Sequence, residues 1–140
     1  MPTPILSPSG YAATRALAFA DPDGNAVIAS AALPLPVTLG WDPTVPLTGT
    51  TTVGGSFGPY QPALGRDVML GLSGSWTGSV RVMRSVDGGL TRVPLTMAGT
   101  TWGQYAANCC EPVWQESEAL ARLYLDVTLS GGVLSYRLAQ

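Results

Sequence analysis

Apolar and polar residues alternate with a period of two through much of the second half of the chain. In DVMLGLSG (67–74), Val68, Leu70 and Leu72 share one side, and LYLDVTLS (123–130) repeats the pattern. Because successive side chains of a strand point to opposite faces, this alternation predicts half-buried strands. Shorter segments of the same kind are 79–85, 90–96, 101–107 and 133–139. Short alternating segments divided by glycines predict an all-β fold, an antiparallel β-sandwich or jelly-roll-like module.

Glycine pairs stand between these predicted strands. Asp87, Gly88 and Gly89 separate 79–85 from 90–96, and Gly131 and Gly132 separate 123–130 from 133–139. Glycine supplies the positive φ of tight turns, and an Asp side chain can bond the turn backbone. We therefore expect all five residues to be structural turn residues of two hairpins.

Two segments allow a helix. ESEALARLYL (116–125) fits a helix with Glu118 four residues before Arg122, or a turn followed by a strand. We favour the turn and strand, because the alternation continues to Leu129. The Ala-rich stretch 11–20 is long enough for two helical turns, which is too short to be stable alone.

The first part of the chain has a different composition. Residues 1–54 hold eight of the twelve prolines and only four charges. Proline removes backbone donors and favours extended chain. We therefore expect an extended Pro-rich N-terminal arm over residues 1–54, used for attachment, and an antiparallel β-sandwich domain over residues 55–140. The expected contact residues of the arm are Leu33, Pro34, Leu35, Pro36, Val37 and Trp41.

The charge content is low. The chain is 46% hydrophobic and 11% charged, its net charge is −2, and its seven basic residues are all Arg. The absence of a basic run argues against nucleic-acid binding. The uncharged stretches are broken by Pro and Gly, so we expect no membrane span and a protein made in the cytoplasm without export. A sparsely charged surface suits a protein that is largely covered by partners.

The residue types for common catalytic sites are missing. Without His there is no Ser-His-Asp or Cys-His arrangement, and without Lys there is no Walker-type loop. SVDGGLTR (85–92) resembles the Asp-box S-x-D-x-G-x-T-W of sialidases, with Arg92 in place of Trp. We interpret it as a hairpin, because the Asp-box is a folding motif. No catalytic residue, cofactor or metal site is expected.

The remaining candidate ligands have plainer interpretations. DPDGNA (21–26) matches the first EF-hand spacings but lacks the Gly and the final Glu, which favours a turn capped by Asp. We expect Glu111, Glu116 and Glu118 to be solvated loop charges. A disulfide between the neighbours Cys109 and Cys110 would be strained, so both are expected to be reduced, one facing the core and one away.

The segment 74–89 reads G-x-W-x-G-x-V-x-V-x-R-S-x-D-G-G, and the chain ends near Y-R-L (136–138). In these motifs the chain resembles small virion proteins of tailed bacteriophages and prophages. The resemblance implies a place in a particle rather than a reaction. The expected function is a capsid decoration (cement) protein bound to the major capsid protein, as a homo-oligomer and by preference a trimer at a threefold site. The alternatives are a tail, baseplate or fibre component contacting the host surface and, third, a glycan-binding or glycan-active protein.

Overall fold

A computed structural model describes residues 17–21, 23–35, 40 and 43–140. The chain divides into two compact units, Met1–Trp41 and Asp42–Gln140. All regular secondary structure in the described residues is strand, and the sheets are antiparallel, which confirms the all-β class. No helix in these residues could cross a membrane.

The described residues of the first unit form a small hairpin. Strands β1 (Ala18–Ala20) and β2 (Ala26–Ile28) pair antiparallel. Asp21 closes the turn, because its carboxylate accepts the N–H groups of Asp23 and Asn25 at 3.0 and 2.7 Å. The turn with an Asp cap is confirmed. The helical alternative for 11–20 is wrong over Ala18–Ala20, where the backbone bonds β2 instead of itself; residues 11–16 lie outside the described residues.

The second unit is built from nine strands. They are β3 (Leu47–Thr51), β4 (Gly55–Tyr60), β5 (Asp67–Ser85), β6 (Val93–Pro94), β7 (Thr96–Met97), β8 (Thr100–Thr101), β9 (Gln104–Tyr105), β10 (Cys109–Gln115) and β11 (Arg122–Ala139). All except the small β7–β8 hairpin belong to one sheet.

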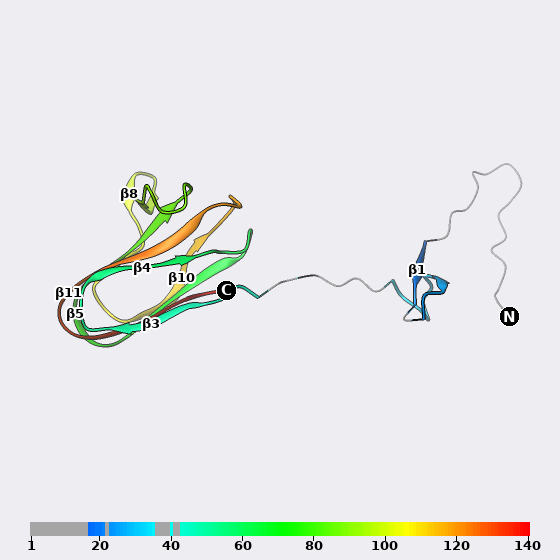
Figure 1. The fold of residues 1–140 in the computed structure, drawn as a ribbon, viewed down its shortest axis with the longest axis horizontal. Helices are drawn as coiled ribbons and strands as arrows, with labels where there is room; N and C mark the ends of the chain where they lie inside the picture. Colours follow the sequence, from blue (N-terminus) through cyan, green and yellow to red (C-terminus); the bar gives the residue numbers. More distant parts are fainter. Residues whose placement is uncertain (1–16, 22, 36–39, 41–42) are drawn as a thin grey trace, which may run out of the picture. The chain divides into compact units, whose positions relative to one another are not determined.

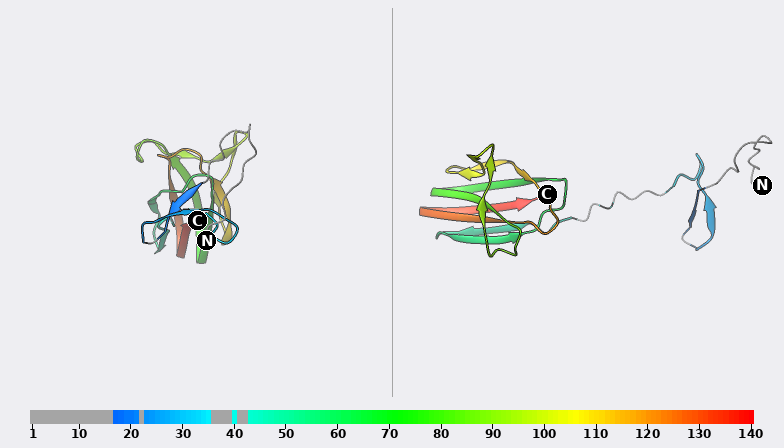
Figure 2. Two further views of the ribbon diagram at one scale, coloured as in Figure 1. Left: turned by 90° about the vertical axis from the view of Figure 1, so that its right-hand side faces the viewer. Right: turned by 90° about the horizontal axis from the view of Figure 1, so that it is seen from above.

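The long strands β5 and β11 pair along almost their whole length and bend together, so that one sheet forms two layers (Figure 1). The first half of β5 and the second half of β11 form one layer, in the order β10–β5–β11–β3. The other halves form the second layer, flanked by β4 on one side and by β6 and β9 on the other. Figure 2 shows the strands of this unit lying side by side from above. The result is sandwich-like.

Glycines make the bend possible. Gly78 and Gly132 have φ values of 145° and 90°. A Cβ at Gly78 would lie 2.0 Å from the carbonyl oxygen of Thr128, and one at Gly132 would lie 2.1 Å from that of Ser75. No side chain fits at either position, so the two strands approach as only glycine allows.

The expected hairpin turn at Gly131 and Gly132 is wrong. β11 runs continuously through both residues, with a register shift between Leu129 and Gly131 that leaves Ser130 as a bulge. Such a bulge bends a strand without ending it. The strands expected separately at 67–74 and 79–85 are likewise one strand, β5.

The core lies between the two layers. Alternate residues of β5 and β11 fill it, as the period-two pattern predicts. Val68, Leu70, Val80, Val82, Leu123, Leu125, Leu134 and Leu138 are completely buried. Tyr136 stacks at a tilt against Phe57, with ring centroids 4.9 Å apart. Burial of this apolar surface is the main stabilising term of the fold.

Two further expectations are decided by pairing. For 116–125 the turn and strand are confirmed, since β11 begins at Arg122. The boundary after residue 54, in contrast, lies too late. β3 pairs with β11 from Leu47 to Thr51, so the second unit begins at Asp42. No proline occurs between residues 47 and 58, so the Thr-rich segment that follows Pro46 can join the sheet.

Candidate functional site

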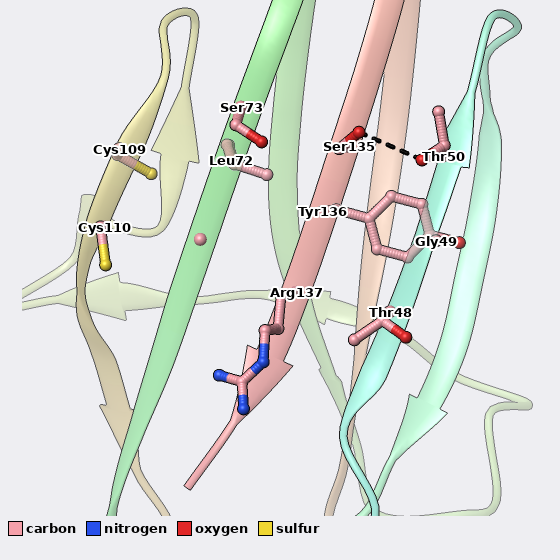
Figure 3. A pocket seen from close by; sticks show the side chains of 11 residues that line it. Thr48, Gly49, Thr50, Leu72, Ser73, Cys109, Cys110, Ser135, Tyr136 and Arg137 are labelled. Atoms are coloured by element: carbon pink, nitrogen blue, oxygen red, sulfur yellow. Dashed lines mark hydrogen bonds between the residues drawn. The ribbon is translucent and has the colours of Figure 1, made fainter.

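A shallow depression of about 650 Å³ is lined by all four strands of the layer β10–β5–β11–β3 (Figure 3). Its lining residues all come from this one layer, so it opens on the outer surface. One row across the strands is formed by Cys110, Gly71, Arg137 and Thr48. Gly71 has no side chain there, and this lowers the floor of the depression to the backbone.

The second row of the depression is formed by Ser73, Ser135 and Thr50. The hydroxyls of Thr50 and Ser135 share a hydrogen bond of 3.1 Å (Figure 3). Arg137 is the single charged residue that lines the depression. These hydroxyls and the one guanidinium lie in a lining that is otherwise mostly apolar, so the depression offers few polar contacts.

The two cysteines differ in environment, as expected. Cys109 packs partly against the core, whereas Cys110 is exposed, and both are free thiols. Burial, together with the nearby Glu111 carboxylate, raises the pKa of the Cys109 thiol. The Cys109 thiol is therefore less accessible than that of Cys110, and it is a poor nucleophile because it stays protonated and partly covered.

The loop 85–92 is held by its own side chains. Ser85 Oγ accepts the N–H of Gly89 at 2.8 Å and donates to Asp87 Oδ1 at 2.7 Å. Both carboxylate oxygens of Asp87 accept the N–H of Thr91 at 2.9 Å. These bonds lower the pKa of Asp87 to about 2, with the Thr91 backbone as the largest cause. Gly88 has positive φ, as does Gly89, and β5 pairs with β6 beyond the loop. The turn expected at Asp87, Gly88 and Gly89 is thus present.

Arg92 fastens this loop to the outer face of the second layer. Its guanidinium carbon lies 4.1 Å from the centroid of the Tyr124 ring, and its Nη1 donates to Ser56. The Tyr124 hydroxyl donates to the carbonyl oxygen of Gly88 at 3.3 Å. In the Asp-box motif this position is Trp. Here the Arg serves a cation–π contact, which is a structural use.

A buried carboxylate that the sequence did not reveal is Glu116. It is 1% exposed, so the expectation of a solvated loop charge is wrong for this residue. Glu111 is exposed but lies in β10 rather than in a loop, whereas Glu118 is exposed and lies after β10, as expected. Arg84 donates to both of its oxygens, at 2.8 and 2.9 Å. Its other donors are the Trp114 indole and the backbone N–H groups of Ser117 and Glu118.

The pKa of Glu116 reflects these opposing effects. Burial alone raises it, but Arg84 and the other donors outweigh burial and lower the pKa to about 2. Glu118 contacts the same guanidinium at 2.7 Å from the solvent side. Both oxygens of Glu116 accept hydrogen bonds from protein groups, so this cluster connects β5, β10 and the turn that follows β10. No local sequence signal marks this cluster, because Arg84 is 32 residues from Glu116 in the chain.

The expected attachment residues are only partly described. Leu33, Pro34 and Leu35 are exposed, while Pro36, Val37 and Trp41 lie outside the described residues. The described part of the chain contains no group of three His, Cys, Asp or Glu side chains close enough to hold a metal ion.

Comparison of the chain with family models, with curated proteins and with solved structures finds no match.

Proposed function

We propose that this chain is a non-enzymatic structural protein of a bacteriophage virion, most specifically a capsid decoration (cement) protein. The second unit is the rigid module presented at the particle surface, and the first unit attaches it to the major capsid protein. The proposal rests on the resemblance of residues 74–89 and 136–138 to small virion proteins and on the surface of the first unit.

The observation that supports the attachment role is that the described residues of the first unit are not buried. None of the residues 17–21 and 23–35 is buried. Leu17, Ile28 and Leu33 are each more than half exposed. An isolated two-stranded hairpin is marginal in water, and the apolar side chains exposed on it are available for contact with a partner. We infer that this unit is completed by a protein surface with apolar pockets.

The second unit supports the other half of the proposal. Its buried residues form one cluster, and its two long strands run through both layers. The carboxylates of Glu116 and Asp87 both accept hydrogen bonds from neighbouring protein groups. Polar groups in this state hold structure in place. A module of this kind resists deformation and presents a fixed surface.

The alternatives are a tail, baseplate or fibre component and, third, a glycan-binding or glycan-active protein. The geometry favours neither. The Asp-box-like loop is the feature that hinted at glycans, but both Asp87 oxygens bind the Thr91 N–H, and Arg92 is held over Tyr124. These contacts favour a loop that stabilises the fold.

The decisive experiment is the copy number of the protein in purified particles, measured by quantitative mass spectrometry against the major capsid protein. A decoration protein follows the symmetry of the capsid lattice, so the expected result is on the order of hundreds of copies per particle. A few to dozens of copies would assign the protein to the tail, and absence from the particle would overturn the proposal.

A further inference from the structure

The edges of the sheet in the second unit are unequal. An edge strand presents unpaired N–H and C=O groups, and proteins usually blunt such edges with Pro, charges, bulges or short length. β10 carries Glu111 and Pro112 and shifts register after the proline. β4 contains Gly58 and Pro59. β6 and β9 have two residues each, and β6 ends at Pro94.

β3 lacks all of these devices. It is a regular five-residue strand, LTGTT, without Pro or charge, and its register with β11 has no shift. Among the described residues it is the last strand of its layer, since the order ends β11–β3. Its far side is therefore a regular, uncharged edge of the kind that pairs with an added strand.

We propose that the occupant of this edge is β3 of a second copy of the chain, paired antiparallel about Gly49. This proposal does not depend on the proposed virion function. It assigns an interaction surface and a twofold symmetry to the module.

The sequence around Gly49 permits a twofold contact without charge repulsion, because no residue from 45 to 53 is charged. Residues 45–53 read VPLTGTTTV, with Thr at 48 and 50 and Val at 45 and 53. An isologous interface uses the same patch on both subunits, so residue i meets j and j meets i. Pairing about Gly49 places Thr48 of one copy opposite Thr50 of the other, and Leu47 opposite Thr51.

Strand geometry restricts the register. Successive residues of an edge strand point their N–H and C=O groups alternately outward and inward, so residues that face each other across the new pair must have the same orientation. A self-paired strand must therefore be centred on a residue. Of the possible centres, Gly49 is the middle of β3 and pairs all five residues.

The exposed side chains fit this arrangement. Val45 is 87% exposed and Val53 is 66% exposed, one at each end of the edge. Both lie just beyond β3, at the two ends of the proposed contact, where a second copy would reduce their exposure. Thr48 and Thr50 lie on the outer face, where facing Thr side chains are a favourable cross-strand pair. The outer faces of the two copies then lie on the same side, and their depressions become neighbours. The symmetry argument favours a dimer over the trimer expected at a threefold site.

The test is the mass of the full chain in sedimentation equilibrium, with charges placed on the edge. Wild type is expected to form a dimer of 14.5 kDa chains. In T48K/T50K, each lysine faces a lysine of the other copy, and dimerisation should weaken by roughly tenfold or more. In T48K/T50E each lysine faces a glutamate, so the dimer should return. An equimolar mixture of T48K/T50K and T48E/T50E should pair in the same way.

Ser73→Lys is the control for added charge: it places one lysine, against two in T48K/T50K, on the same outer face but on an interior strand. It should dimerise like wild type. Circular dichroism establishes that each variant is folded. A monomeric or trimeric wild type overturns the proposal, as does a T48K/T50K variant that dimerises as tightly as wild type. Failure of T48K/T50E to recover the dimer overturns the register about Gly49.

Discussion

At the scale of single residues, two carboxylates reach the same pKa from opposite surroundings. Glu116 is buried and Asp87 is exposed, yet the pKa of each is about 2. In both cases N–H groups are directed at the oxygens, and donors of this kind stabilise the charged form. Each carboxylate therefore stabilises the folded chain only while it is ionised.

Replacing Glu116 by Gln should lower the free energy of unfolding by about 2–4 kcal/mol, because the new NH₂ group faces donors in either orientation. Glu118→Gln is the control. Glu118 contacts the same arginine but is 56% exposed, so we expect a loss of at most about 1 kcal/mol. Chemical denaturation at pH 7 measures both. An equal decrease in the free energy of unfolding for the two variants would show that burial of Glu116 does not strengthen its ion pair with Arg84.

The same variant carries a pH prediction. The pKa of Glu116 is lower in the folded chain, about 2 against 4.5, so its contribution is fully present above pH 4.5 and is lost as the pH falls towards 2. Wild type should therefore lose its advantage over Glu116→Gln across this range. Melting curves between pH 2 and pH 7 compare the two proteins. A constant difference at every pH would contradict the lowered pKa.

Replacing Asp87 by Ala should lower the melting temperature, because the N–H of Thr91 loses its acceptor and Ser85 loses a partner. Val86→Ala is a neighbouring control with no side-chain hydrogen bond, and it should melt close to wild type. On the proposed structural function, the variant changes no catalytic property. Glycosidase turnover by wild type that disappears in Asp87→Ala would contradict that function.

At the scale of elements, the shared bend of β5 and β11 determines the architecture. Two strands of 19 and 18 residues cross from one layer to the other without interruption. If Gly131 and Gly132 formed a hairpin turn, residues 133–139 would pair with residues 123–130, and β11 would fold back on itself. The bend instead leaves both halves of β11 beside β5, and this creates the two layers.

Two adjacent glycines of β11 give a sharp test of the bend. Gly132→Ala should destabilise the fold by more than about 2 kcal/mol, since φ is 90° and the new Cβ would meet Ser75 backbone at 2.1 Å. Gly131→Ala should be tolerated, because nothing lies within 4 Å of its Cβ position. Thermal melting of the two variants provides the comparison. Similar melting temperatures for both would show that the close approach at Gly132 is not required.

At the scale of the whole molecule, the buried core lies in the second unit and the proposed attachment surface lies in the first. The second unit contains the described core, and none of the described residues of the first unit, 17–21 and 23–35, is buried. The folded module should therefore be independent of the first unit, while the proposed attachment depends on it.

A truncated chain that begins at Pro43 should keep the melting temperature of the module but fail to bind particles that lack the protein. A chain that begins at Ser56 should be markedly less stable, because residues 134–138 of β11 lose β3 as their neighbour. Melting curves and a particle-binding assay read out the two properties. Full binding by the chain from Pro43 would place the attachment surface in the second unit.

Sequence pattern alone was sufficient to predict the all-β class, the core-facing residues of β5 and β11, the turn at Asp87 and the turn before β11. These follow from period-two alternation and from turn chemistry, which act over a few neighbouring residues. It also predicted the Asp21 turn and the opposite environments of the two cysteines, for the same local reason.

Contacts in the folded chain set the start of the module, the bend in place of a turn at 131–132 and the burial of Glu116. The alternation did not predict β3 or β10 either. These Thr-rich and Pro-containing segments become strands because they hydrogen-bond to the backbone of a long neighbouring strand, β11 or β5. Each of these outcomes depends on residues distant in sequence: β11 for β3, the carbonyl of Ser75 for Gly132, and Arg84 for Glu116. Local pattern does not encode such pairings, because they exist only once the sheet has folded onto itself.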